Sequence, residues 1–314
     1  MTMALCIPAY NAETFLPRIL SDAASQTQPF DEIWVHDDAS TDHTSEVARS
    51  LGAQVIRSDT NVGCSLGKHR LLMETSCDRV HFHDADDGLK PDFVATTADF
   101  LSNAERDIDV LLVGFEYRDM ASDELLAEHY YDHARISEDP IAYSLSQPIN
   151  AICGVYRCAA LRSSGGYQIP KNQLFNEDQA FHCRLARAGL SFAAIAHCPV
   201  INYRVQGSMS GAAQLACVQA QYEVMAEAAC KSDPIYHPLI ARRLWQIGSS
   251  AAAWKDWSVA DASVVLASSL HAKGPEEGHR IYRWLAAHAP RLAIRVRRLA
   301  IAALGKQPPM GISS

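Results

Sequence analysis

The chain has 314 residues, enough for one large domain or for one domain with an appendage, and either can bury a sizeable core. Its 48% hydrophobic and 20% charged residues are typical of a folded soluble protein. The formal net charge of −8 argues against a nucleic-acid coat, because phosphate contacts need a basic face.

Strand-like and helix-like segments alternate through the first half of the chain. The predicted strands cover residues 4–8, 32–36, 54–57, 79–83 and 110–115. The predicted helices between them cover 15–23, a segment from a capping Ser40 to Leu51, a segment containing Leu71 to Met73, and 92–101. Repeated units of this length imply an α/β fold with a parallel, helix-flanked sheet. Ligands of such sheets bind outside the carboxyl ends of the strands.

Three carboxylates stand together where the fourth predicted strand ends, in Asp84-Ala85-Asp86-Asp87. They repel one another unless a cation neutralises them, and Mg²⁺ or Mn²⁺ prefers oxygen ligands and leaves positions open for substrate phosphates. Taken alone, the segment favours a simple acidic turn, since such turns are common. Asp37 and Asp38 follow another predicted strand, so one pocket could gather all of these carboxylates.

The middle of the chain is less regular, and residues 116–143 are expected to form loops with short helices. A glycine turn at Gly165-Gly166 precedes an amphipathic helix that opens with Glu177 and Asp178 and closes at Gly189. Two strand-like runs follow at 192–195 and 200–205, and the pattern beyond Gly211 is helical. We therefore place a domain boundary near Ser210.

The cysteines indicate a reducing compartment. All nine lack C-x-x-C and zinc-ribbon spacing, so we expect reduced core residues in a cytoplasmic protein. The first predicted strand begins almost at once, leaving no room for a signal peptide, and no apolar stretch reaches the roughly 18 residues of a membrane span. His81 and His83 share one strand face, where buried neutral imidazoles are favoured over a zinc site. The tryptophans at 245, 254, 257 and 284 are interpreted as helix-packing anchors.

Six motifs in order resemble those of family 2 glycosyltransferases with the GT-A fold, which transfer a sugar from a nucleotide-diphospho-sugar. They are Ile7-Pro8-Ala9-Tyr10-Asn11, His36-Asp37-Asp38-Ala39-Ser40-Thr41-Asp42, Asn61-Val62-Gly63, Asp84-Ala85-Asp86-Asp87, Glu177-Asp178, and Tyr203-Arg204 with Ser208-Met209-Ser210. The resemblance implies a Rossmann-like, mostly parallel sheet flanked by helices, in a glycosyltransferase domain over 1–210 and a helical C-terminal extension over 211–314. Within the first domain, it implies a nucleotide-binding half at about 1–117 and an acceptor half at about 118–210.

The resemblance also implies a role for individual residues. Asp38 would accept a hydrogen bond from uracil or another base, Tyr10 would stack on the base, and Asp84 would contact the ribose or a nearby water. Asp86 is the first choice for the Mn²⁺ or Mg²⁺ ligand, with Asp87 next. The further donor-binding residues are Pro8, Asn11, Asn61, Gly63, Ala85, Arg204, Ser208 and Ser210. The residue-level alternative for Asp37 and Asp38 is helix capping, and both roles can hold at once, one for each carboxylate.

Asp178, with Glu177 beside it, is the candidate general base that would take the proton of an acceptor hydroxyl. The implied reaction is inverting transfer from a donor of the UDP-sugar type by a hexosyl- or N-acetylhexosaminyl-transferase of polysaccharide biosynthesis. The Gln-x-x-Arg-Trp motif of processive synthases is missing after Asp178, so we expect a non-processive enzyme. Two alternatives stay open: another nucleotide-sugar or nucleotidyl-transferring enzyme, and a catalytically silent binding module.

The acceptor is expected to be a glycan or a lipid-linked glycan, and its identity stays open. From Pro290 the chain places Arg291, Arg295 and Arg298 on one helical side and Leu292, Val296 and Leu299 on another. Such a basic amphipathic helix can lie on anionic lipid at the inner face of the membrane. Packing onto the globular domain is equally compatible with the pattern, because Ile294 and Ile301 interrupt the division of faces.

Overall fold

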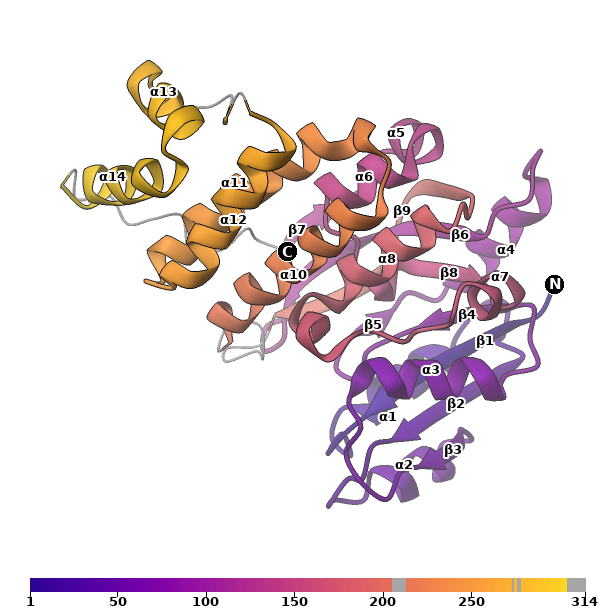
Figure 1. The fold of residues 1–314 in the computed structure, drawn as a ribbon. Coiled ribbons are helices and arrows are strands. Elements are labelled where there is room, and N and C mark those ends of the chain that lie inside the picture. Colours follow the sequence, from indigo (N-terminus) through magenta and orange to yellow (C-terminus); the bar gives the residue numbers. More distant parts are fainter. Residues whose placement is uncertain (205–212, 273, 276–277, 304–314) are drawn as a thin grey trace. The chain divides into compact units, whose positions relative to one another are not determined.

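The computed structural model describes the chain except for residues 205–212, 273, 276–277 and 304–314 (Figure 1). The chain forms two compact units. The first comprises 1–140, 149–169 and 184–206, and the second comprises 141–148, 170–183 and 207–314. The predicted boundary residue Ser210 lies outside the described residues, and the division into domains at 1–210 and 211–314 stays a prediction.

The N-terminal part of the sheet is parallel, as the alternating pattern predicts. Its strand order is β3-β2-β1-β4, and Leu5 of β1 lies between Ile33 of β2 and His81 of β4. The bounds of these strands are β1 Met3–Ala9, β2 Glu32–Asp37, β3 Gln54–Arg57 and β4 Arg79–Phe82. Since the strands run in one direction, their carboxyl ends share one edge of the sheet.

Helices connect these strands, as predicted. They are α1 Leu16–Ala24, α2 Thr44–Ser50, α3 Cys64–Glu74 and α4 Phe93–Asn103. The predicted cap of α2 was wrong, because the helix begins four residues after Ser40. The Ser40 hydroxyl instead accepts a hydrogen bond from the Asn11 amide at 2.9 Å, and Asp42 accepts from the Thr44 amide at 3.0 Å.

The rest of the sheet is mixed, with the order β4-β8-β6-β9-β5 and with β7 beside β6. Three short strands were missed in the sequence, namely β5 Gly88–Leu89, β7 Leu125–His129 and β8 Gly154–Arg157. β8 runs antiparallel between β4 and β6, and β6 runs parallel to β9. The predicted α/β class is confirmed, while the expected loops at 116–143 include strand.

The two runs predicted at 192–195 and 200–205 form one strand, β9 Phe192–Arg204, beside a longer β6, Val110–Asp119. Val113 pairs with Ile195 and Phe115 pairs with Val200, so β9 bulges opposite Gly114. A Cβ atom at Gly114 would lie 2.6 Å from both the Cys198 sulfur and the His129 carbonyl oxygen. Only glycine fits at this crossing.

Helices make up the remaining elements. Four follow β7 and precede β9 in the sequence: α5 His133–Glu138, α6 Pro140–Ser146, α7 Cys158–Ser163 and α8 Glu177–Arg187. Short 3₁₀ turns occur at η1 Ala151–Cys153, η2 Lys171–Asn176 and η3 Pro234–Tyr236. The helical pattern predicted beyond Gly211 is confirmed by α10 Gln214–Lys231, α11 His237–Ala253, α12 Trp257–Leu270, α13 Arg280–His288 and α14 Pro290–Ala303. Within the described part of the chain, no helix has the length and apolar character to cross a bilayer.

Burial in the core, expected for the cysteines and for the paired histidines, is found for six of the nine cysteines and for both histidines. All nine cysteines are free thiols, and most of them are buried. His81 and His83 are fully buried, and their rings approach at 3.1 Å between Nε2 of His81 and Nδ1 of His83. Burial lowers the pKa of His81 to about 4 and that of His83 well below its usual range, so both imidazoles are neutral.

Glu32 at the start of β2 fastens this strand to the segment before β4. Its carboxylate accepts hydrogen bonds from Trp34 Nε1 at 2.8 Å, from Thr75 Oγ1 at 2.7 Å, and from the amide and hydroxyl of Ser76. Burial alone would raise the pKa, but the bonds from Ser76, Thr75 and Trp34 lower the pKa of Glu32 to about 2. The ionised form therefore stabilises the fold.

Replacing Glu32 with glutamine is expected to lower the free energy of unfolding by about 1.5–3 kcal/mol at neutral pH, because hydrogen bonds to a charged group are lost. The depressed pKa means that this stabilisation is present above the unfolded value of about 4.3 and disappears as the pH falls toward about 2. Urea denaturation of Glu32→Gln at neutral and acidic pH, beside the exposed Glu74→Gln control, measures the difference. Equal stability of Glu32→Gln and wild type at neutral pH would contradict the expectation.

Candidate active site

The carboxyl edge of the parallel strands brings together residues from separate segments of the chain. The Asp38 amide donates to the Ala9 carbonyl at 2.8 Å, so Tyr10 and Asp38 leave neighbouring strands side by side. Tyr10 is 53% exposed, which leaves its ring accessible. Pro8 is buried within β1. A Cβ atom at Gly67 would lie 3.3 Å from the Pro8 Cβ, which shows how closely α3 covers this strand.

The turn after β2 is built on the buried carboxylate of Asp37. It accepts hydrogen bonds from the Ser40 amide at 2.9 Å and from the Ser45 hydroxyl, and it forms an ion pair with Arg57. Burial opposes ionisation, but the bonds from Ser40 and Ser45 and the charge of Arg57 lower the pKa of Asp37. Asp37 is therefore an ionised structural residue of this turn, but it does not cap α2, whose first residue is Thr44 and which has no side-chain cap.

Asp38 connects this turn to the loop before α3. Its two carboxylate oxygens accept from the Val62 amide at 2.7 Å and from the Gly63 amide at 2.8 Å. Gly63 has a φ of 87°, a conformation that favours glycine, and the neighbouring Asn61 is exposed. Because each carboxylate oxygen has two lone-pair directions, Asp38 keeps acceptor capacity for a ligand.

Asn11 joins the ends of β1 and β2. Its side-chain oxygen accepts from the Thr41 amide at 2.8 Å, and its own amide donates to Ser40. Its φ of 49° is accessible to asparagine at low cost. Backbone and side-chain hydrogen bonds thus connect the segments that carry the predicted donor-binding residues Tyr10, Asn11, Asp38, Asn61 and Gly63, with Pro8 buried in β1 beside them.

The aspartate cluster follows β4 at the same edge of the sheet. Asp84 and Ala85 are half-buried, Asp86 is exposed, and Asp87 is only 3% exposed. Asp87 accepts from the Asn202 side chain at 2.9 Å and from the Tyr203 amide at 2.9 Å. Burial, followed by the charges of Asp84 and Asp86, raises the pKa of Asp87 well above its usual range. Through its hydrogen bonds with Asn202 and Tyr203, Asp87 connects the cluster to β9.

A buried lysine was missed in the sequence. Lys68 of α3 places its Nζ 3.5 Å from an Asp84 carboxylate oxygen and 5.2 Å from the centre of the Tyr167 ring. Its position three and four residues before the buried Leu71 and Leu72 puts it on the inner face of the helix, which is the signal that could have revealed it. The fold therefore supplies one cation beside the first aspartate.

The donor atoms of this cluster fit a hard divalent cation. Asp86 reaches solvent, yet partial loss of hydration and then the charge of Asp84 raise its pKa, so its negative charge is incompletely compensated. In the ranges described, no three His, Cys, Asp or Glu side chains converge as a metal cage. One or two carboxylates suit Mg²⁺ or Mn²⁺, which retains waters and binds substrate phosphates.

The C-terminal end of β9 carries Arg204, whose guanidinium lies 4.0 Å from the centre of the Tyr117 ring. The adjacent Tyr203 ring packs against Arg18 at 4.3 Å, a second cationic contact that the sequence did not reveal. Ser208 and Ser210, predicted to close over the diphosphate, lie outside the described residues.

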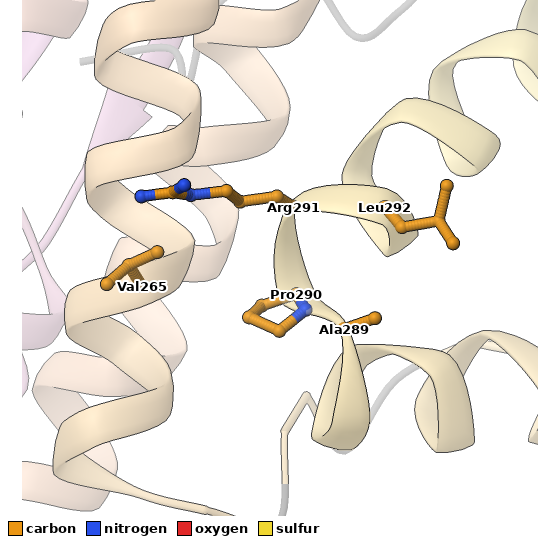
Figure 2. Close-up of a pocket in the computed structure, with 5 residues that line it drawn as sticks. All are labelled: Val265, Ala289, Pro290, Arg291 and Leu292. Atoms are coloured by element: carbon orange, nitrogen blue, oxygen red, sulfur yellow. The ribbon is translucent and has the colours of Figure 1, made fainter.

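Glu177 and Asp178 occupy the first turn of α8 and belong to the second unit, whereas Asp38 and Asp86 belong to the first. Glu177 and Asp178 are both half-buried. The Asp178 carbonyl oxygen contacts Nδ1 of His182 at 2.7 Å, which orders this turn. The pocket drawn in Figure 2 lies elsewhere in the second unit, since Val265 of α12 and residues 289–292 line it.

Comparison with known proteins agrees with this geometry. The model of "Glycosyl transferase family 2" matches residues 4–162, from β1 to α7, which includes the carboxyl edge and the aspartate cluster. The chain therefore belongs to glycosyl transferase family 2. Glu177, Asp178 and Arg204 lie beyond the matched segment.

Curated relatives include two bacterial glycosyltransferases. Poly(ribitol-phosphate) beta-N-acetylglucosaminyltransferase TarS of Staphylococcus aureus is 27% identical over 190 residues, covering 58% of this chain and 32% of TarS. Glycosyltransferase GlyA of Streptococcus pneumoniae is 30% identical over 112 residues, covering 34% of this chain and 16% of GlyA. The chain thus spans a third or less of the length of these relatives.

Solved structures show the same fold. The crystal structure of S. aureus TarS 1-349 in complex with UDP-GlcNAc has a TM-score of 0.72 at 19% identity and covers 98% of this chain and 93% of that one. Mannosyltransferase PcManGT from Pyrobaculum calidifontis, in complex with GDP-Man and Mn²⁺, has a TM-score of 0.60 at 18% identity and covers 95% and 86%. These similarities confirm the predicted GT-A architecture with C-terminal helices.

Proposed function

We propose that this protein is a metal-dependent, non-processive, inverting glycosyltransferase that uses a nucleotide-diphospho-sugar, with UDP-sugar as its donor. The observation that supports the proposal is that Tyr10, Asp38, Asp84 and Asp86 follow the neighbouring parallel strands β1, β2 and β4 of a family 2 chain, whose carboxyl ends share one edge. The TarS complex with UDP-GlcNAc supports a uridine donor and a hexosyl or N-acetylhexosaminyl group. The complex of PcManGT with Mn²⁺ supports the metal.

Donor binding is proposed to use both ends of this edge. Tyr10 stacks on the base, which is worth about 1–3 kcal/mol, while Asp38 accepts a hydrogen bond from it. Asp84 contacts the ribose or a nearby water, and Asp86 is the protein ligand of Mn²⁺ or Mg²⁺. Asp87 was predicted as a further ligand, but its contacts with Asn202 and Tyr203 lead us to propose that it positions Asp86 instead.

Transfer is proposed to proceed by in-line displacement. The acceptor oxygen bonds to the anomeric carbon as the bond from that carbon to the diphosphate oxygen breaks, and Asp178 takes the acceptor proton, with Glu177 beside it. Arg204, together with Ser208 and Ser210, stabilises the departing diphosphate. A bound divalent ion supplies electrostatic stabilisation of the same group.

The acceptor is proposed to be a glycan or lipid-linked glycan, consistent with a role in polysaccharide biosynthesis. TarS is named for a poly(ribitol-phosphate) acceptor, but this chain matches only part of TarS. A lipid-linked acceptor would bring a cytoplasmic enzyme to the inner face of the membrane, and the basic helix α14 is the segment proposed for that contact.

A hydrolysis screen of nucleotide-sugars tests the proposal without knowledge of the acceptor. In the presence of Mn²⁺, one UDP-sugar is expected to release UDP well above the rate without protein, and chelation of the metal is expected to abolish the release. Coupled detection of UDP measures the rate. Binding of UDP without turnover of any donor, with or without candidate acceptors, would favour the silent binding module.

A further inference from the structure

The last two helices expose large apolar side chains to solvent. In α13, Ile281 is 70% and Trp284 is 62% exposed; in α14, Leu292, Val296 and Leu299 are all exposed, Leu299 at 70%. The interpretation of Trp284 as a packing anchor was therefore wrong. Its ring instead stacks on His288 one turn later, at 4.8 Å between ring centres. Trp284, Ile281 and His288 share the outer face of α13 at helical spacing.

Helix α14 has separate packing and outer faces. Ala293 and Ile294 are buried, while Leu292, Val296 and Leu299 recur at intervals of four and three residues on another face. Figure 2 shows Leu292 directed away from α12. The sequence left open whether this helix packs on the domain or lies on lipid. Packing accounts for the buried Ile294, but among the described residues no element covers the face of Leu292, Val296 and Leu299.

Specific contacts hold α14 in this orientation. Arg295 forms a bidentate ion pair with Asp261 of α12 at 2.6 and 2.8 Å, and Arg297 lies 5.8 Å from the centre of the Tyr282 ring of α13. Helix α14 is therefore held against α12 and α13 by these two arginines, while Leu292, Val296 and Leu299 face outward.

The charge of this helix pair is opposite to that of the chain. Residues 280–303 contain six arginines and no aspartate or glutamate, whereas the whole chain has 28 basic and 36 acidic residues. Arg280, Arg283 and Arg291 are exposed beside the apolar faces. A second copy is a poor occupant for this surface, because a two-fold contact would bring the exposed Arg280, Arg283 and Arg291 of both protomers together.

We propose that α13 and α14 form a docking surface for an anionic lipid bilayer. Leucine, valine, isoleucine and tryptophan side chains enter the headgroup boundary, and the arginines bind lipid phosphates. The inference extends the proposed function, because binding to a bilayer would bring the enzyme to a lipid-linked acceptor; this biological role rests on the proposed function. Lipid binding is measured without donor or acceptor, so its failure would leave the donor-hydrolysis result standing.

Vesicle co-sedimentation of the whole chain tests the proposal. Vesicles of phosphatidylcholine mixed with phosphatidylglycerol are expected to bind the protein at least about tenfold more tightly than pure phosphatidylcholine vesicles, and added salt is expected to weaken that binding. The double variant Trp284→Ala, Leu299→Ala and the double variant Arg280→Ala, Arg291→Ala are each expected to bind at least about tenfold more weakly.

Ile235→Ala is the matched control, because Ile235 is a 76% exposed apolar side chain of η3 in the same unit. It is expected to bind vesicles like wild type. Circular dichroism and thermal unfolding show that each variant is folded. Equal binding to both vesicle types, no binding to either, or a dimer in light scattering that the Trp284→Ala, Leu299→Ala variant dissociates would overturn the proposal.

Discussion

Asp86→Ala is expected to lose metal-assisted nucleotide binding and to transfer sugar at least about 100-fold more slowly, since a bound metal contributes several kcal/mol to stabilising the leaving group. Neighbouring carboxylates are poorly placed to substitute. Asp87 is buried and bound to Asn202 and Tyr203, and Asp84 lies beside Lys68. Calorimetry with UDP, with and without Mn²⁺, and donor hydrolysis measure the two losses.

The same substitution is expected to leave the fold as stable as wild type or more stable. Partial burial and the charge of Asp84 raise the pKa of Asp86, so at a pH above this pKa the ionised carboxylate makes an unfavourable contribution to folding. A variant with lower activity and an unchanged or higher Tm therefore separates lost function from lost folding. Glu105→Ala, at an exposed position after α4, is the control. If Asp86→Ala bound UDP with wild-type dependence on Mn²⁺, the ligand assignment would be wrong.

Asp178→Asn is expected to bind UDP and Mn²⁺ like wild type and to transfer sugar about 10²–10⁴-fold more slowly, because an amide cannot take the proton of the acceptor. The substitution keeps the shape of the side chain and leaves the backbone contact with His182 in place. Calorimetry measures donor binding, and single-turnover transfer or donor hydrolysis measures the chemical step.

Glu177→Gln is the matched comparison, since it removes one charge from the same helical turn. A much smaller loss of rate in Glu177→Gln than in Asp178→Asn is expected if Asp178 is the base. Full activity of Asp178→Asn would sink that assignment. A loss of UDP binding equal to the loss of rate would move Asp178 to the donor side of the reaction.

The parallel part of the fold could be predicted because each strand there is followed by a helix with its own apolar face, and strand ends then share an edge. The mixed part could not. β5 has two residues, too few to show a period, and β8 runs antiparallel to both of its neighbours, outside the repeated parallel units. The bulge of β9 opposite Gly114 made one strand look like two. Strands that pair with partners far away in the sequence have only a weak sequence pattern of their own.

The candidate site shows the same division between local pattern and tertiary contact. The positions of Asp38 and Asp86 at strand ends follow from the chain alone. The difference between Asp37 and Asp38 does not, because it depends on Arg57 for one and on the Val62 and Gly63 amides for the other. Lys68 reaches Asp84 only through the packing of α3 against the sheet.

The buried carboxylate of Asp87 connects the segment of the proposed metal ligand to the segment of the proposed diphosphate-binding arginine. Asp87 directly follows Asp86, and the Tyr203 amide that it binds directly precedes Arg204. The proposed metal ligand and the proposed diphosphate cation are thus adjacent to the two partners of a single hydrogen bond. The hydrogen bond between Asp87 and the Tyr203 amide therefore helps to fix the distance between the proposed metal ligand, Asp86, and the proposed diphosphate-binding residue, Arg204.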